Sequence, residues 1–245
     1  MTVSFKLTLS ESTAEFIASM PHVYAQAFSR EDAEEHARIA SERGASPGRV
    51  VVWRTLPQGV AILCVVADDR PGLVALVSSA FLAHSLDVRS AQIYCRTLAN
   101  GRLEAVDFFW LRSVSAGLPL DPRRLEACAR TIRELLGADA GSVAAPERGL
   151  APGDSGATVT YAEDPSTPEL WEVVLEARDF PGLLHTVAGL LHQNGLEVVR
   201  CEVRTEAGIA KDRLFVTAFN AKPALPQLDA FRAALLDLIS AVGKS

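Results

Sequence analysis

The chain has 245 residues, of which 49% are hydrophobic and 22% charged, and its formal net charge is -6. These values are typical of a globular protein with a buried core, and the length suits two domains of about 100 residues or one larger domain. Lys and Arg are scattered along the chain, so the basic surface that nucleic-acid binding requires is not predicted.

Residues 1–48 form an N-terminal extension in which one element has clear ends. Ser29 is a typical helix N-cap and Gly44 a typical residue just after a helix, so a helix is predicted over 29–43. Residues 1–20 carry little signal. The next segment, RVVVWRT at 49–55, is rich in β-branched residues and predicts a strand.

An internal repeat follows. The sequence D-R-P-G-L at 69–73 recurs 110 residues later as D-F-P-G-L at 179–183, and this offset gives seven identities across the 20 positions from 69 to 88. Repeats of a solenoid are much shorter, about 20–50 residues, so this period indicates duplicated modules.

Both copies predict the same elements. Opening strands are expected at 60–66 and 171–177, and each leads directly into an apolar-striped helix at the repeated motif. A second helix is expected from Asp121-Pro122 to Gly137 in the first copy. Its counterpart is expected over about 225–243.

The segment between the two helices of each copy predicts a β-hairpin. Asn100-Gly101 and Ala207-Gly208 mark the turns. In both copies the apolar residues of the first hairpin strand change face soon after its start, following Val88 and Val198. This shared change of parity predicts a β-bulge at the same place in each copy.

The edge strands decide the domain boundaries. Residues 138–155 are rich in Ala, Gly, Pro and Ser and predict a linker. The first module, 49–137, is expected to take its fourth strand from 156–162. The second module, 170–245, has no sequence left for a fourth strand, so the strand at 49–55 is expected to cross over and cover its open edge.

A βαββαβ order with D-x-P-G-L at the first strand–helix junction resembles the ACT domain, a small-molecule-binding module of ferredoxin-like fold. The tandem arrangement is similar to the paired ACT domains that end bacterial PII uridylyltransferase/uridylyl-removing enzymes. M-P-H-V-Y at 20–24 and the strand starts L-D-V at 86–88 and G-L-E-V at 195–198 add to this resemblance, which covers roughly residues 20–243. It implies an α+β fold with two ferredoxin-like modules, antiparallel sheets, helices on one face, and an N-terminal helical segment.

The resemblance also implies a function. It suggests a non-catalytic regulatory protein of nitrogen or amino acid metabolism, which binds a small amino acid, glutamine first, and signals to a protein partner. The nucleotidyltransferase and phosphohydrolase motifs of those enzymes are absent from this sequence, and no nucleophile–base pair is evident, so neither enzymatic activity nor a cofactor is predicted. The alternative is a ligand-free module for protein interaction or homodimerisation.

The two repeated junctions are the candidate ligand sites. Gly allows close approach to the backbone, the N–H groups at a helix start attract a carboxylate, and an adjacent Asp could pair with an ammonium group. Alternatively, Pro and Gly only make the turn, and Asp69 and Asp179 cap the helices. The first junction is favoured because Arg70 keeps the usual family residue, and the neighbouring module is expected to close the pocket. The predicted ligand-binding residues are Asp69, Arg70, Pro71, Gly72, Leu73, Asp179, Phe180, Pro181, Gly182 and Leu183.

Other chemistry-bearing residues have structural interpretations. The four cysteines (Cys64, Cys95, Cys128 and Cys201) lie far apart in apolar segments, which predicts free thiols and a reducing, cytoplasmic compartment. The histidines lack metal-ligand spacing, so no metal is expected. No signal peptide or membrane-spanning segment is predicted. The aromatic run at 108–110 is expected to pack in the core rather than bind RNA.

Overall fold

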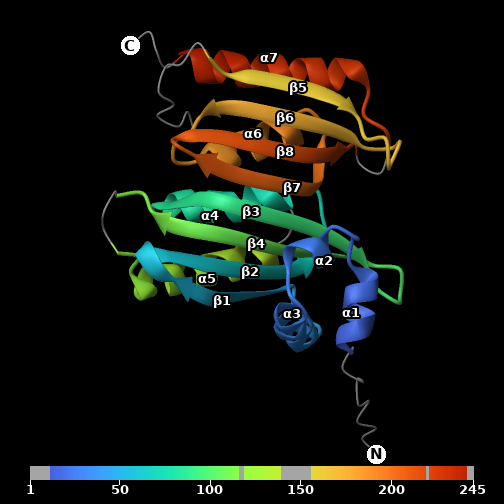
Figure 1. The fold of residues 1–245 in the computed structure, drawn as a ribbon, viewed down its shortest axis with the longest axis vertical. Coiled ribbons are helices and arrows are strands. Elements are labelled where there is room, and N and C mark those ends of the chain that lie inside the picture. The colour runs from blue at the N-terminus through green and yellow to red at the C-terminus, as the bar shows by residue number, and fades with distance from the viewer. Residues whose placement is uncertain (1–11, 116–118, 139–155, 219–220, 242–245) are drawn as a thin grey trace, which may run out of the picture.

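The computed structural model describes residues 12–115, 119–138, 156–218 and 221–241, and forms one eight-stranded antiparallel sheet (Figure 1). Apart from Ala138, the predicted linker lies outside the described residues. The strand order is β1-β2-β4-β3-β7-β8-β6-β5. The strands are β1 (Gly48–Leu56), β2 (Val60–Asp68), β3 (Leu86–Thr97), β4 (Leu103–Ser113), β5 (Thr158–Glu163), β6 (Trp171–Arg178), β7 (Glu197–Glu206) and β8 (Ile209–Thr217).

In the described part of the chain, four helices lie on one face of this sheet, and the three N-terminal helices lie on the other (Figure 1). The first module has the order β1-β2-α4-β3-β4-α5 and the second β5-β6-α6-β7-β8-α7. The α+β class and the two ferredoxin-like modules are thus confirmed. The helices are α1 (Thr13–Ser19), α2 (Tyr24–Ala27), α3 (Arg30–Arg43), α4 (Leu73–Ala83), α5 (Pro122–Gly137), α6 (Leu183–Gln193) and α7 (Leu225–Ala241).

The predicted exchange of edge strands is wrong. β1 pairs with β2 over its whole length, from Gly48 opposite Ala67 to Leu56 opposite Val60. The segment 49–55 therefore completes the first module, and the segment 156–162, which forms most of β5, pairs with β6 in the second. The physical reason is the short connection: a one-turn 3-10 helix at Pro57–Gly59 joins β1 to β2, so the hairpin closes at little entropic cost.

Each module is consequently completed by the strand that precedes it. The chain order is ββαββα rather than the expected βαββαβ, although the added strand lies beside the opening strand, as the last strand of a ferredoxin-like module would. The spatial fold is retained while the chain order is circularly permuted.

Several local predictions are confirmed. Ser29 accepts a hydrogen bond from the backbone N–H of Asp32 at the start of α3, and Gly44 ends that helix with φ 55°. Asp121 caps α5 by accepting from the N–H of Arg123 at 2.9 Å. The helix α1 was not predicted, although Ser12 and Glu15 form a capping box at its start.

Both predicted bulges are present, because the pairing register shifts after Val88 in β3 and after Val198 in β7. The hairpin turns are also where they were expected, with Gly101 at φ 80° and Gly208 at φ 78°.

The sheet has a core on each face. On the face covered by α4–α7, called the helix side below, one continuous apolar cluster runs through both modules, and α4 packs against α6 across the module boundary. On the other face, α1–α3 bury a second cluster, with Phe16, Tyr24 and Ile39, against β2 and β4. Phe108 joins this second cluster and Phe109 the first, and both are fully buried. Trp110 is partly buried and packs against the second cluster, so the aromatic run packs in the core as predicted.

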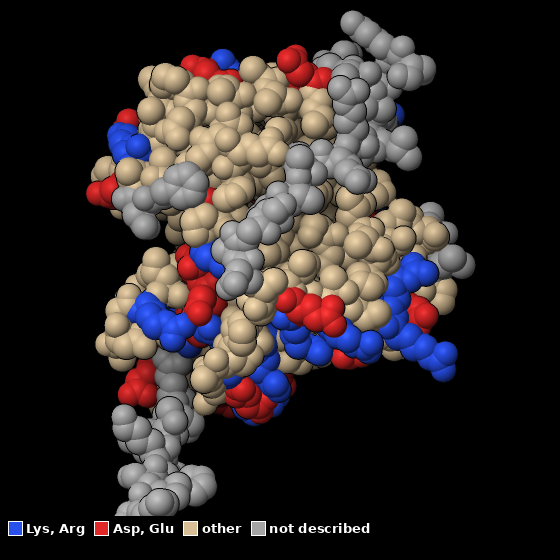
Figure 2. Space-filling model, turned by 180° about the vertical axis from the view of Figure 1, so that it is seen from behind, with Lys and Arg blue, Asp and Glu red and all other residues tan. Residues whose placement is uncertain are grey.

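Charge is unevenly spread over the helix side. Charged side chains gather over the first module (Figure 2), where α5 exposes Arg123, Glu126, Arg130, Arg133 and Glu134. Within the described residues, no helix is long and apolar enough to cross a membrane.

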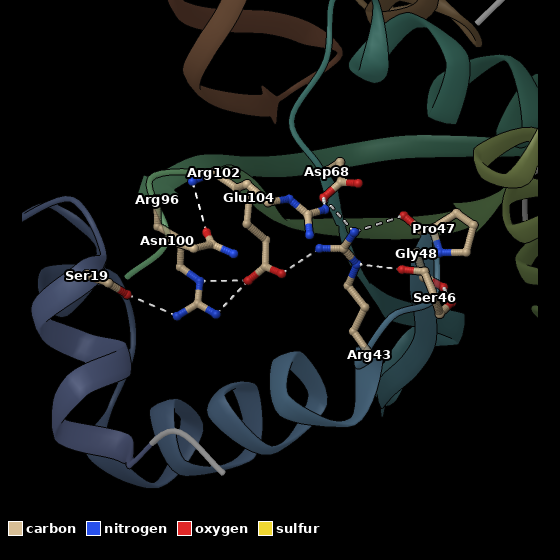
Figure 3. Close-up of polar contacts among 10 residues, drawn as sticks. All are labelled: Ser19, Arg43, Ser46, Pro47, Gly48, Asp68, Arg96, Asn100, Arg102 and Glu104. Atoms are coloured by element: carbon tan, nitrogen blue, oxygen red, sulfur yellow. Dashed lines mark hydrogen bonds and ion pairs between the residues drawn. The ribbon is translucent and has the colours of Figure 1, made fainter. Parts of the chain in front are cut away.

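A buried ion cluster fastens the N-terminal helices to the first module (Figure 3). Glu104 on β4 accepts from Arg43 at the end of α3 at 2.7 Å and from Arg96 on β3 at 2.8 Å and 2.5 Å. All three side chains are 5% exposed or less. Arg96 also donates to Ser19 at 3.0 Å, and Arg43 pairs with Asp68 at 2.7 Å. One carboxylate thus pairs with two guanidinium groups, one from the N-terminal helices and one from the sheet.

We expect Glu104→Gln to lower the free energy of unfolding by about 3 kcal/mol, because two buried guanidinium groups lose their shared counter-charge. Urea unfolding followed by circular dichroism measures this. Glu126→Gln is the matched control, since Glu126 and Arg133 form an exposed pair at 2.9 Å, worth less than about 1 kcal/mol. Equal effects of the two substitutions would contradict the anchoring role.

Candidate functional site

Both repeated motifs form the same turn between a strand and a helix. In the first, the N–H of Leu73 donates to the carbonyl of Arg70 at 3.2 Å, and the second motif repeats this bond at 3.1 Å. Gly72 and Gly182 have φ 76° and 90° with ψ near zero. This is the third position of a type II turn, which requires positive φ and favours Pro immediately before it. The glycines are therefore needed for the turn itself.

The motif aspartates do not cap the helices. The N-cap residues of α4 and α6 are Gly72 and Gly182, which as glycines have no side chain that could cap the helix. Asp69 instead lies beside the thiol of Cys95, and burial raises the pKa of its carboxyl. Burial likewise raises the pKa of Asp179, which lies beside Thr205.

A second, more deeply buried aspartate accompanies each motif. Asp107 on β4 and Asp212 on β8 are 0% and 1% exposed. Burial, reinforced by the negative charge of Asp179, raises the pKa of Asp212 to about 7, and burial beside Asp69 raises that of Asp107 well above its usual range. Asp107 Oδ2 and Asp212 Oδ1 have no hydrogen-bond partner among the described residues. Each junction therefore holds two carboxyl groups in a desolvated position.

Sequence reasoning missed these two residues, although a signal existed. Asp107 lies within the apolar run AVDFFW, and Asp212 is its identical counterpart in the second copy, where the hairpin is five residues shorter and the offset is therefore 105. A carboxylate inside an apolar strand is costly unless it is paired, so its repetition in both copies was itself a functional indication.

Each junction borders a small cavity that the other module closes, as expected. The first is lined by Asp69, Gly72 and Asp107 together with residues 196–199 of the second module. The second is lined by Asp179, Gly182, Asp212 and residues 86–88 of the first module, among others. Each has a volume of about 20 Å³, enough for about one water molecule.

The remaining predicted residues have distinct positions. Arg70 lines the first cavity, and its Nη2 donates to the carbonyl of Leu135 in the last turn of α5 at 3.1 Å. Leu73, Phe180 and Leu183 belong to the helix-side core and also line the cavities, whereas the two prolines, Pro71 and Pro181, are exposed and line neither. Phe180 thus contributes to the core at the position where the first motif has Arg70.

The two junctions differ in what their helix-start amide contacts. In the first, the N–H of Gly72 donates to Glu197 Oε2 of the second module at 2.8 Å. In the second, the N–H of Gly182 has no acceptor among the described residues. The nearby residues Asp87 and Arg112 pair with each other at 2.7 Å, and Arg112 lies 3.4 Å from Asp179.

The cysteines take no part in a disulfide. All four are free thiols, of which Cys64, Cys128 and Cys201 are buried and Cys95 is partly buried. Burial raises the pKa of each thiol, that of Cys128 to about 12, so these groups are poor nucleophiles at neutral pH. In the described part of the chain, no cluster of His, Cys, Asp and Glu is arranged to hold a metal ion.

The chain is similar in sequence to bifunctional uridylyltransferase/uridylyl-removing enzymes. That of Caulobacter vibrioides is 28% identical over 210 residues, which are 82% of this chain and 22% of the enzyme. That of Phenylobacterium zucineum is 29% identical over 208 residues, 81% of this chain and 21% of the enzyme. The resemblance indicated by the two motifs is confirmed. The chain spans about a fifth of the length of these relatives.

Two other comparisons add little. No family model matches the chain. The crystal structure of an unknown protein from Galdieria sulphuraria covers 76% of this chain, and 94% of its own, at 19% identity with a TM-score of 0.25, which does not demonstrate a common fold.

We expect Asp212→Asn to stabilise the protein at pH 8 but hardly at pH 4. The carboxyl has a folded-state pKa of about 7, above its unfolded value of about 3.9, so its cost appears as the pH rises through this interval and is absent below it. The gain at pH 8 should be on the order of 2–4 kcal/mol. Urea unfolding at both pH values measures it, with the exposed Asp237→Asn as control. A gain that is equal at the two pH values would contradict the raised pKa.

Proposed function

We propose that this chain is a non-catalytic, cytoplasmic regulatory protein in which a free amino acid binds at a D-x-P-G-L junction between the modules. One observation carries the proposal: Asp212 presents a buried carboxylate oxygen without a partner, at an apolar interface beside a helix start. Such a group lowers stability unless a cation pairs with it. The sequence similarity to uridylyltransferase/uridylyl-removing enzymes supports a role in nitrogen or amino acid metabolism.

The second junction fits an amino acid zwitterion better than the first. Its donors, the N–H of Gly182 and the guanidinium of Arg112, would bind the α-carboxylate. Its acceptors, Asp179 and Asp212, would bind the α-ammonium group, and charge-assisted bonds of this kind are the strong ones. At the first junction Arg70 reaches towards α5 and Glu197 already contacts the helix-start amide. Glutamine is the first candidate ligand.

Binding requires the modules to move. A cavity of about 20 Å³ holds no amino acid, and its walls come from both modules. The ligand would therefore favour a packing in which α6 and the start of β3 lie further apart, and this shift would be the signal to a protein partner.

The alternative is a ligand-free module for interaction or homodimerisation. The small size of both cavities favours it. A thermal-shift series with the twenty amino acids at millimolar concentration separates the two functions, because a ligand that binds only the folded state raises Tm. If no amino acid raises Tm and calorimetry with L-glutamine shows no heat of binding, the sensor function fails and the interaction module takes its place.

We expect Asp212→Asn to weaken amino acid binding about tenfold or more at pH 8, since one charge-assisted contact to the ammonium group is lost. Because the same substitution stabilises the fold, weaker binding could not be ascribed to unfolding. Asp107→Asn is the matched control, as it alters the equivalent residue of the first junction and should leave affinity within about twofold. Calorimetry on the three proteins decides, and equal affinities would contradict the assigned site.

A further inference from the structure

We propose that Glu197 is an internal ligand that occupies the helix start of the first junction, so that only the second junction keeps its helix-start amide available to a free amino acid. The occupation of the first junction stands on the contacts of Glu197 alone. The statement about the second junction rests on the proposed function.

Glu197 holds the position that a ligand carboxylate would take. It lies at the start of β7, in the other module, and its Oε2 accepts the N–H of Gly72 at 2.8 Å. Gly72 is the N-cap of α4, an 11-residue helix, and the start of a helix carries the partial positive charge that attracts anions. Glu197 Oε1 lies 3.0 Å from His192 Nδ1 near the end of α6. Both oxygens are therefore engaged, and the side chain is 17% exposed.

The equivalent residue of the first module behaves differently. The 110-residue offset places Asp87 in the position of Glu197. Asp87 is paired across the hairpin with Arg112, at 2.7 Å and 2.6 Å. Its side chain is also one methylene shorter. Asp87 thus pairs within its own hairpin and does not reach the N–H of Gly182.

The cross-strand neighbour explains the contrast. Opposite Glu197 on β8 lies Thr217, which carries no charge. With no cation across the hairpin, Glu197 extends to the other module and finds the amide of Gly72. One Asp-to-Glu difference and one Arg-to-Thr difference make the two junctions chemically unequal although their turns are alike.

The inequality predicts the number of ligands bound. A carboxylate held on the same chain competes at a high effective concentration, so a free amino acid displaces it with difficulty. The wild-type chain should bind one amino acid, at the second junction. Removing the carboxylate of Glu197 should expose the first junction to a second one.

The first experiment needs no amino acid. In Glu197→Ala, the exchange of the Gly72 amide proton should be about tenfold faster than in wild type. Its nitrogen–proton resonance should then move back towards the wild-type position as sodium acetate replaces sodium chloride at constant ionic strength. Glu202→Ala, on the same strand with a partly exposed side chain, is the control. It should change neither the exchange rate of the Gly72 amide nor the response of its resonance to acetate. Glu197→Gln keeps an acceptor oxygen, so the exchange rate of its Gly72 amide should lie between those of wild type and Glu197→Ala. This variant also covers the case in which the alanine variant does not fold. If the amide is unchanged in both variants, or acetate moves it equally in wild type, Glu197 is not an internal ligand.

The second experiment is calorimetry with L-glutamine. One equivalent for wild type and two for Glu197→Ala support the proposal. Two equivalents for wild type would overturn it and leave the proposed function standing. No binding by either protein would end the proposed function, while the acetate experiment would still decide the role of Glu197.

Discussion

The antiparallel pairing of β3 with β7 is the interaction on which the other features depend. Its central pair is Gln92 and Glu202, and these residues are each other's counterparts under the 110-residue offset. A local two-fold axis therefore passes through this pair, and the two modules meet as in an isologous dimer contained in one chain. The pairing satisfies the backbone groups of two sheet edges at once, and it also brings α4 against α6. Each repeated turn is thereby placed against the other module.

Symmetry of this kind makes equivalent sites, and the side chains then make them different. The turns, the glycine conformations and the buried aspartates are shared by both copies. The residues that reach across the axis are not shared, since Glu197 contacts a backbone amide while Asp87 contacts an arginine. The N-terminal helices add a further difference. Within the described residues, they cover the sheet face opposite α4–α7 only in the first module.

Sequence reasoning predicted the repeat, the helix limits, the bulges and the turns, because these depend on residues close together in the chain. It failed on the edge strands, since the type of a strand is a local property but its partner is not. The repeat did indicate the correct pairing. The same offset that aligns Gly72 with Gly182 aligns Gly48, where β1 begins, with Thr158, where β5 begins, so each of these strands is the first strand of its own module. For the site, the motif glycines were found and the deeper aspartates missed. The contact of Glu197 with Gly72 spans 125 residues and depends on the register between modules, so no local pattern predicts it.

The permuted chain order has a consequence for synthesis on the ribosome. Because β1 precedes the elements it borders, the first module possesses all four strands and both helices once residue 137 has been made. It can therefore bury the apolar surface between its own sheet and helices before β5 emerges, and domains that fold as units in the order of synthesis expose less surface to aggregation. An exchange of edge strands would have left the first module incomplete until residues 156–162 had been translated, and would have left 49–55 without a partner until the strands of the second module had been made. The hairpin of β1 with β2 thus makes folding of this duplicated protein sequential rather than interdependent.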